Sequence, residues 1–223
     1  RFICALQPAM SDDRNILHYE LLLRLNHLGT IIDANYFMPV ILHFKWMDKI
    51  DKYVISHLIA CGQEVPIAVN LSLSFIQQNA NLKWLKEQLR DFKQNKSAPI
   101  CFEISNNSII QDTDSCIELS NMLQAFGYNI GVDHFMVSSH NLSYLQTIKP
   151  KYIKIDAQYL ISLLKGSSEE LPNRSLITLT ELLNIMIIAI GVDSKELLDE
   201  LKTLHINYFQ GNYIAKSKLH QVT

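Results

Sequence analysis

The segment His18-Tyr19-Glu20-Leu21-Leu22-Leu23-Arg24-Leu25 decides the fold and points to the site. Its apolar run predicts a β-strand, yet it carries an acid and a base, Glu20 and Arg24. Side chains four residues apart lie on one face of a strand, because their orientation repeats every second residue. Two interpretations are open. The pair is either an ion pair that holds the end of the strand, or part of a site where Glu20 receives a metal or polar group and Arg24 a phosphate.

The composition is that of an ordinary folded chain. The 223 residues are 48% hydrophobic, and the formal net charge is -2. No basic stripe or polybasic run indicates a nucleic acid polymer or direct contact with a membrane. The four cysteines are scattered without a C-x-x-C pair, which argues against zinc and disulfides and is typical of a reducing compartment. No apolar run approaches the roughly 20 residues of a transmembrane helix.

Segments that predict strands alternate with segments that predict helices along the whole chain. Two strands come first, at 2–7 and 17–25, and the polar turn at 11–15 should join them in an antiparallel hairpin. Further strands are predicted at 66–72, 100–104, 128–133, 152–156, 185–189 and 207–209. Helices are predicted at 35–42, 49–61, 82–92, 114–126, 142–148, 171–183 and 194–204.

This alternation predicts the fold class. Apolar strands separated by helices indicate a parallel sheet that is covered on both faces. About eight such units favour an α/β fold of the (β/α)8 TIM-barrel type, here modified by an antiparallel N-terminal strand. No low-complexity linker divides residues 1–223, so we expect one domain, with its most flexible loop at 165–170. The start on a strand-like segment, without a signal peptide, predicts a domain excised from a longer multidomain signalling protein.

Polar side chains end most of the predicted strands. Each could simply cap a helix or form a local ion pair. In a barrel, however, all these ends open onto one face, where sites are built. Carboxylates and a carboxamide suit Mg²⁺ or Mn²⁺, and a lysine and an arginine suit phosphate. The set therefore predicts a site for a phosphorylated ligand, built with Glu20 and Arg24 from Asn70, Glu103, Asp133, Lys154, Asp156 and Gln210.

Short motifs in a fixed order give the chain a family resemblance. The chain resembles the EAL domain, a barrel that binds and hydrolyses the second messenger cyclic-di-GMP. Tyr19-Glu20-Leu21-Leu22-Leu23-Arg24 is similar to the signature strand, with Leu21 where Ala or Val is usual. The other matching motifs are Leu6-Gln7-Pro8, Phe37-Met38-Pro39, Val69-Asn70-Leu71-Ser72, Phe102-Glu103-Ile104-Ser105, Gly131-Val132-Asp133, Lys154-Ile155-Asp156 and Gln210-Gly211.

The resemblance implies a role for each matching position. Four residues correspond to metal ligands: Glu20, Asn70, Glu103 and Asp133. Asp156 corresponds to a second position of that kind, and Lys154 to the residue beside the attacking water. Arg24 matches the residue that holds a ligand phosphate. The remaining ligand contacts would be Gln7, Gln210, Leu22 and an apolar pocket around Phe37 and Pro39.

Three departures remove acids from the motif set. Asn106 replaces the second Glu of Glu-Ile-Thr-Glu, and His134 replaces the second Asp of Asp-Asp-Phe-Gly, which also loses its glycine to Met136. Ile190 replaces the Glu of Ala-Glu-Gly-Val-Glu, and the loop 137–141 is rewritten. Two adjacent divalent cations repel each other unless several carboxylates neutralise them. We therefore expect no catalytic residues, with Glu20 and Lys154 vestigial, and at most one weakly bound Mg²⁺ or Mn²⁺ on the vestigial ligands.

The expected function is a catalytically inactive cyclic-di-GMP receptor, similar to the degenerate EAL module of LapD-type receptors. This resemblance implies a cytoplasmic domain of an inner-membrane protein, which relays the signal to upstream domains or partners. A homodimer is compatible with it, because EAL domains often pair through barrel helices. Two alternatives stay open: a weakly active metal-dependent cyclic-di-GMP phosphodiesterase, and an EAL domain that binds other proteins and no nucleotide.

Overall fold

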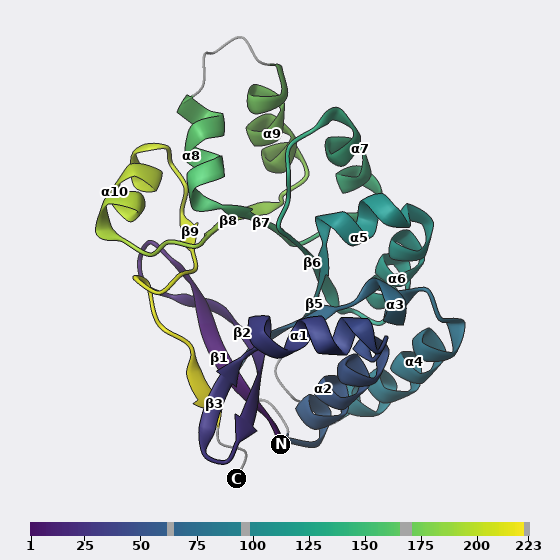
Figure 1. The fold of residues 1–223 in the computed structure, drawn as a ribbon. Coiled ribbons are helices and arrows are strands. Elements are labelled where there is room, and N and C mark those ends of the chain that lie inside the picture. Colours follow the sequence, from purple (N-terminus) through teal and green to yellow (C-terminus); the bar gives the residue numbers. More distant parts are fainter. Residues whose placement is uncertain (62–64, 95–98, 166–170, 221–223) are drawn as a thin grey trace.

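The computed structural model describes residues 1–61, 65–94, 99–165 and 171–220. Eight strands form a closed barrel, with β1 paired to both β9 and β2. In chain order they are β1 (Phe2–Ser11), β2 (Ile16–His27), β4 (Ile67–Leu71), β5 (Ile100–Ser105), β6 (Asn129–Asp133), β7 (Tyr152–Asp156), β8 (Met186–Ile190) and β9 (Tyr208–Phe209). The predicted barrel is confirmed, as Figure 1 shows from one end.

The first strand runs opposite to the others. β1 is antiparallel to β2, with Gln7 opposite Glu20, and antiparallel to β9. The other barrel strands, β2 and β4 to β9, are parallel to one another. Two short strands extend this sheet beyond the barrel: β3 (Thr30–Asp33) pairs with β2, and β10 (Lys218–His220) pairs with β1. The predicted antiparallel N-terminal strand is thus present, and its C-terminal end points away from the face that carries the site.

Helices surround the barrel except beside β1, where β3 and β10 lie (Figure 1). They are α1 (Ala34–His43), α2 (Met47–Cys61), α3 (Leu73–Ile76), α4 (Asn79–Gln94), α5 (Asn106–Gln111), α6 (Thr113–Ala125), α7 (Ser139–Ile148), α8 (Ala157–Lys165), α9 (Leu171–Leu182) and α10 (Lys195–Thr203). Three of these, α3, α5 and α8, and the edge strands β3 and β10 were absent from the sequence-based prediction. Most of the loop predicted at 165–170 lies outside the described residues.

The barrel interior is layered. Ala9, Ala68, Cys101, Tyr152 and Ile188 pack together as one apolar cluster inside the strands. Small residues leave room for the Tyr152 ring: a Cβ on Gly131 would lie 2.4 Å from ring atom Cε2. Because inward side chains repeat every second residue, the next layer toward the C-terminal ends of the parallel strands consists of the residues two positions along, which are polar except for Ile190.

Cys4, Cys101 and Cys116 are buried. Among the helices of the described part of the chain, none has the length and apolar character needed to cross a membrane.

Candidate functional site

The site lies at the barrel face formed by the C-terminal ends of the parallel strands. Glu20, Asn70, Glu103, Asp133 and Lys154 stand there on β2, β4, β5, β6 and β7. Gln7 joins them from the antiparallel β1, and Gln210 follows β9 directly. The structure therefore brings together residues that lie up to about 200 positions apart in the sequence, as the barrel topology predicts.

A lysine ammonium group occupies the centre of this layer. The Nζ atom of Lys154 lies 2.7 Å from Oε2 of Glu20 and 2.7 Å from the carboxylate of Glu103. All three side chains are buried, and Lys154 is 1% exposed. A buried charge is stable only when it is paired and hydrogen-bonded, so these three groups depend on one another.

Glu20 accepts further hydrogen bonds from two carboxamides. Nδ2 of Asn70 donates to Oε1 at 2.8 Å, and Nε2 of Gln210 donates to Oε2 at 2.8 Å. Burial alone would raise the pKa of Glu20, but the charge of Lys154 and these donors outweigh it and lower the pKa to about 2. Glu20 is therefore an anion at every physiological pH.

Glu103 lies deeper and has a different set of contacts. The Tyr152 hydroxyl donates to its Oε1 at 2.6 Å, and Nε2 of His18 lies 3.8 Å from the same oxygen. Burial raises the pKa of Glu103, and Lys154 opposes that shift. His18 is buried and stacked on Tyr152, with ring centroids 4.8 Å apart. Burial and the positive charge of Lys154 lower the pKa of His18 to about 3, so its imidazole is neutral.

Asp133 stands at the side of this cluster. Its Oδ1 accepts a hydrogen bond from the backbone N–H of His134 at 2.9 Å, and Oδ2 lies 3.6 Å from Nε2 of the same residue. Burial raises the pKa of Asp133, while Lys154 lowers it. His134 adopts a left-handed backbone conformation, with φ 51°, and its side chain is exposed. It projects toward solvent and lines the cavity at the mouth of the barrel.

That cavity opens directly above the cluster and measures about 450 Å³. It includes six of the residues predicted for the site, Gln7, Glu20, Arg24, Asp133, Lys154 and Gln210. The rest of its lining is Asp33, His134, Ile190, Gly191, Asp193, Gly211, Asn212 and Ser217. The volume falls in the usual range of small-molecule sites, and the lining is unusually polar for one.

Arg24 and Glu20 line this cavity without pairing with each other. Nε of Arg24 lies 2.7 Å from Oδ1 of Asp33, the last residue of β3. Nη1 donates to the carbonyl of Leu23 at 3.0 Å, and Nη2 contacts Oγ of Ser217 at 3.5 Å. Of the two interpretations of the Glu20–Arg24 spacing, the ion pair between them is therefore wrong, and each residue has a partner elsewhere.

Besides Asn70 and Glu103, which are hydrogen-bonded within the Lys154 cluster, four predicted ligand contacts do not line the cavity. Leu22 is half-buried on β2, and Phe37 is buried with its ring centroid 5.7 Å from that of Phe2. Pro39 is exposed on α1. Oδ1 of Asp156 accepts from the backbone N–H of Tyr159 and so caps α8. A role for these four in ligand binding stays a prediction.

The residues at and near the positions of the missing acids make other contacts. Asn106 is buried, and its Oδ1 accepts a hydrogen bond from the Tyr144 hydroxyl. Ile190 places an apolar side chain on the cavity wall. Asp193, also on that wall, accepts from the backbone N–H of Asn212 at 2.9 Å.

The carboxylates do not form a metal site in this arrangement. Glu20 and Glu103 direct oxygens at the Lys154 ammonium, and Asn70 directs its amide N–H, a donor, at Glu20. Within residues 1–61, 65–94, 99–165 and 171–220, no three His, Cys, Asp or Glu side chains gather as metal ligands would. A divalent cation would have to displace the ammonium group, so the donor set as it stands does not fit a metal.

Three residues of the site were missed from the sequence. Asp33 orients Arg24, and Tyr152 and His18 contact Glu103. The sequence could have predicted two of them. His18 precedes Glu20 by two positions and Tyr152 precedes Lys154 by two, and side chains two positions apart on a strand lie on the same face. Asp33 has no such signal, because it reaches Arg24 through the β2–β3 turn.

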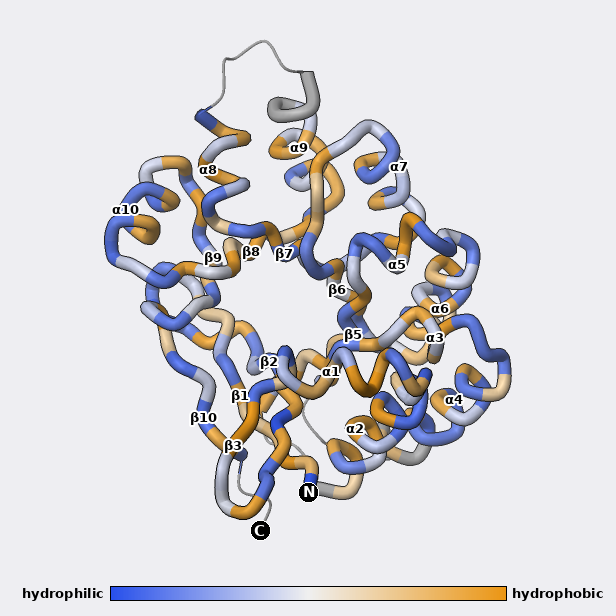
Figure 2. Tube along the Cα trace, viewed as in Figure 1, coloured by the Kyte–Doolittle hydropathy of each residue, from blue (hydrophilic) through white to orange (hydrophobic). Residues whose placement is uncertain are grey.

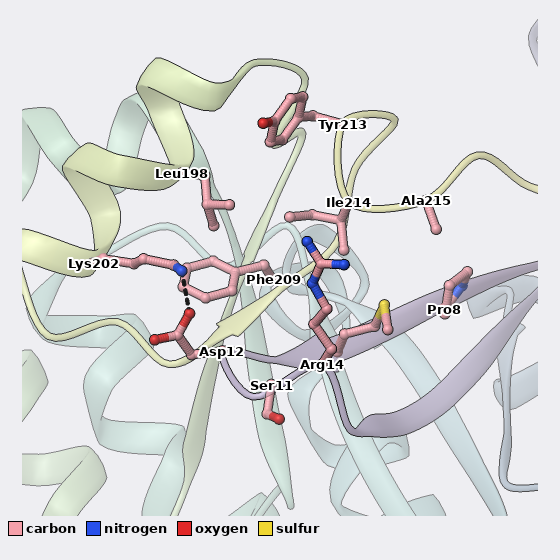
Figure 3. A pocket seen from close by; sticks show the side chains of 11 residues that line it. Pro8, Ser11, Asp12, Arg14, Leu198, Lys202, Phe209, Tyr213, Ile214 and Ala215 are labelled. Carbon is pink, nitrogen blue, oxygen red and sulfur yellow. Dashed lines mark ion pairs between the residues drawn. The ribbon is translucent and has the colours of Figure 1, made fainter.

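A second cavity, of about 290 Å³, lies away from the site between α10, β1 and the segment 213–215 (Figure 3). Its walls are mostly apolar, from residues such as Met10, Leu198 and Phe209. Asp12 and Lys202 form an ion pair at its edge, and Arg14 extends into it. Of the predicted site residues, none lines this cavity.

Comparison with known proteins identifies the family. The family model described as the EAL domain matches residues 1–217. One similar curated protein, the cyclic di-GMP phosphodiesterase PdeB of Shewanella oneidensis, is 27% identical over 205 residues, which cover 88% of this chain. These residues cover only 24% of that protein, so the chain spans about a quarter of its length.

Solved structures share the fold. The FimX EAL domain of Xanthomonas citri in complex with c-diGMP has a TM-score of 0.82 and 15% identity, and the match covers 100% of this chain and 91% of that one. The S helix-GGDEF-EAL portion of Vibrio cholerae LapD bound to c-di-GMP has a TM-score of 0.78 and 23% identity, covering 94% of this chain and 52% of the other. With the family model matched almost end to end and the same barrel in these structures, this chain belongs to the EAL domain family.

Proposed function

We propose that this chain binds cyclic-di-GMP as a receptor domain and does not hydrolyse it. The observation that carries the proposal is a cavity that keeps Arg24 and two carboxamides, in a chain where Asn106, His134 and Ile190 stand in place of the acids of the family motifs. In addition, Nζ of Lys154 lies 2.7 Å from the carboxylates of Glu20 and Glu103 and neutralises part of the negative charge that remains.

The cavity offers groups that suit a cyclic dinucleotide. Arg24 presents a guanidinium group, held in place by Asp33, and guanidinium groups bind phosphates through charge-assisted hydrogen bonds. Gln7 and Gln210 supply carboxamides that can donate to or accept from base edges. Support also comes from the similar FimX and LapD structures, which contain bound c-di-GMP.

Hydrolysis requires a pair of metal ions in addition to ligand binding. A two-metal mechanism needs two cations about 3.5–4 Å apart, which hold the attacking and leaving oxygens. Asn106, His134 and Ile190 stand where the family motifs carry acids, and Asn106 is engaged by Tyr144. Of the acids that remain, Glu20 and Glu103 share one ammonium group, so little negative charge beyond that of Asp133 and Asp156 is left for a pair of cations.

The proposal extends to the setting of the domain. Because the similar phosphodiesterase PdeB is about four times as long, we place this barrel as one domain of a longer signalling protein. The resemblance to LapD-type receptors extends the proposal to a cytoplasmic domain of an inner-membrane protein. In that setting, ligand binding at the mouth would be relayed to upstream domains or partner proteins.

Two measurements on the same preparation test the proposal. Titration calorimetry with cyclic-di-GMP should show saturable binding, and chromatography after incubation with Mn²⁺ or Mg²⁺ should show no linear pGpG. Arg24→Ala should weaken this binding strongly, and Lys49→Ala, which changes an exposed cation on α2, should leave it unchanged. No heat and no thermal shift at high micromolar ligand would leave only a nucleotide-independent interaction domain and would reject the receptor.

A weak phosphodiesterase is the second candidate. One observation favours it: Glu20, Asn70, Glu103 and Lys154 are all present and in mutual contact. If pGpG forms with Mn²⁺ and disappears in Glu20→Gln, this candidate replaces the receptor that does not hydrolyse its ligand.

A further inference from the structure

The cavity between α10, β1 and the segment 213–215 is separate from the cavity at the barrel mouth, although β1 borders both. Gln7 lines the mouth, and the next residue, Pro8, lines this second cavity, because successive side chains of a strand point to opposite faces. Nε2 of Gln7 donates to the carbonyl of Ala215 at 3.2 Å, so a hydrogen bond spans the wall between the two spaces. We call the second space, of about 290 Å³ and drawn in Figure 3, the α10 cavity.

The walls of the α10 cavity are mostly apolar. Helix α10 is amphipathic, and Figure 2 shows its leucines as hydrophobic stretches between hydrophilic ones. Leu201 is fully buried, whereas Leu198 is only half-buried and faces the cavity. Met10, Phe209 and Tyr213 contribute a thioether and two aromatic rings to the lining. Such groups pack favourably against a further aromatic ring, so these walls suit a ligand that contains one.

The volume of the α10 cavity fits one small molecule. An apolar cavity of about 150 Å³ can hold benzene, and ligand pockets in proteins begin near 300 Å³. A cavity of about 290 Å³ therefore has room for an aromatic ring with a short side chain. It is too small for a helix or a strand of another protein, because a helix with its side chains is about 10 Å wide.

One positive charge in the α10 cavity has no counterion. Lys202 and Asp12 form an ion pair at the edge and neutralise each other. Arg14 extends into the cavity in Figure 3, and among the described residues its guanidinium group has no hydrogen-bond or ion-pair partner. With two cations and one anion, the lining carries a net charge of +1, which is complementary to a monoanion. A guanidinium group binds a carboxylate through two parallel N–H···O hydrogen bonds.

The turn between β1 and β2 holds the backbone of Arg14 in place. The backbone N–H of Arg14 donates to the carbonyl of Ser11 at 2.9 Å, and the backbone N–H of Asp12 donates to the carbonyl of Asn207 at 2.8 Å. Arg14 has a left-handed backbone conformation, with φ 62°, at a turn position where glycine is usual. Because the backbone is already fixed, binding of an anion has to order only the side chain, which reduces the entropic cost.

We propose that the α10 cavity is a binding site for a small aromatic carboxylate. The ring lies among Met10, Leu198 and Phe209, and the carboxylate accepts hydrogen bonds from the guanidinium group of Arg14. The inference rests on this cavity alone and does not depend on the function proposed for the barrel mouth.

Titration of the whole chain with 3-phenylpropionate, followed by ¹H–¹⁵N NMR, tests this site. The probe should bind with a dissociation constant of about 1 mM or less, the range that a ligand of this size reaches. It should shift the backbone amide signals of Met10, Leu198 and Tyr213, which line the cavity. Acetate lacks the ring and 3-phenylpropan-1-ol lacks the charge, so each should bind at least about tenfold more weakly.

Three variants separate the charge from the apolar walls. Arg14→Gly removes the guanidinium group and suits the left-handed turn, so it should weaken probe binding at least about tenfold without lowering the melting temperature. Arg90→Ala, which removes an exposed arginine from α4, is the matched control and should leave binding unchanged. Leu198→Trp fills part of the cavity and should also weaken binding. A melting curve of each variant shows whether it is folded.

Several results would overturn the inference. The first is the absence of shifts at the three amide signals with up to about 10 mM 3-phenylpropionate. The second is acetate binding as tightly as the probe, and the third is wild-type affinity in folded Arg14→Gly. Binding that survives Arg14→Gly but is lost in Arg24→Ala would place the anion at the barrel mouth instead of the α10 cavity.

Discussion

Replacing Lys154 with methionine removes the ammonium group that lies between two buried carboxylates. Methionine keeps most of the side-chain volume, so packing changes little. Glu20 and Glu103, each 2.7 Å from Nζ in the wild-type chain, would then face each other without a cation. Removing one member of a buried charge pair costs about 3–5 kcal/mol of the free energy of unfolding. For a chain of this length that corresponds to a Tm lower by roughly 6–20 °C.

The pH dependence of the loss identifies its cause. In the wild-type chain the pKa of Glu20 is lowered to about 2, so Glu20 contributes stability above its unfolded pKa that is lost as the pH falls toward 2. Without Lys154, burial would raise the pKa of Glu20 above its ordinary value and would raise the pKa of Glu103 further. The folded variant then holds protons that the unfolded chain has released, so its stability falls as the pH rises. The deficit should therefore be larger at pH 8 than at pH 5.

The assay is urea denaturation followed by circular dichroism at these two pH values. Lys151→Met is the matched control, because Lys151 is an exposed lysine just before the same strand and should cost little. Millimolar Mn²⁺ should raise the Tm of Lys154→Met more than that of the wild-type chain, since the two carboxylates are then available to a cation. A loss under about 1 kcal/mol, or an equal Mn²⁺ effect on both chains, would refute the argument that Lys154 occupies the place of a cation.

Three further predictions concern the site and the layer beneath it. Arg24→Ala should weaken cyclic-di-GMP binding by about 10–150-fold, because one hydrogen-bonding charged group is lost, and the melting curve should stay unchanged. If calorimetry shows wild-type affinity, the phosphate binds elsewhere. Gly131→Ala should destabilise the chain by about 1–3 kcal/mol in urea denaturation, because its Cβ would lie 2.4 Å from the Tyr152 ring, and a neutral result would mean that the ring can move aside. His18→Phe should reduce the loss of stability at acid pH. Because the folded pKa of His18 is about 3, this residue makes the wild-type chain less stable as the pH falls from about 6.5 to 3. Equal slopes of the free energy of unfolding against pH in both chains would contradict this.

Much of the fold could be predicted from the sequence because it depends on local patterns. The alternation of apolar strands and amphipathic helices was sufficient for the barrel and for the antiparallel first strand. The elements that were missed have weak local signals. β3 and β10 are short edge strands that gain order only by pairing with β2 and β1, and α8 begins directly after β7, capped by Asp156.

The candidate site could likewise be predicted from the sequence only in part. The sequence by itself determined the family and the chemistry at the strand ends, since strand alternation assigns each polar residue to the inner or outer face. Only the tertiary structure decided which of these residues meet. Lys154 lies 134 positions from Glu20 and 51 from Glu103, and Arg24 meets Asp33 rather than the nearby Glu20. The physical reason is that alternation determines the direction of a side chain, whereas its partner depends on the register of neighbouring strands and the closure of the barrel.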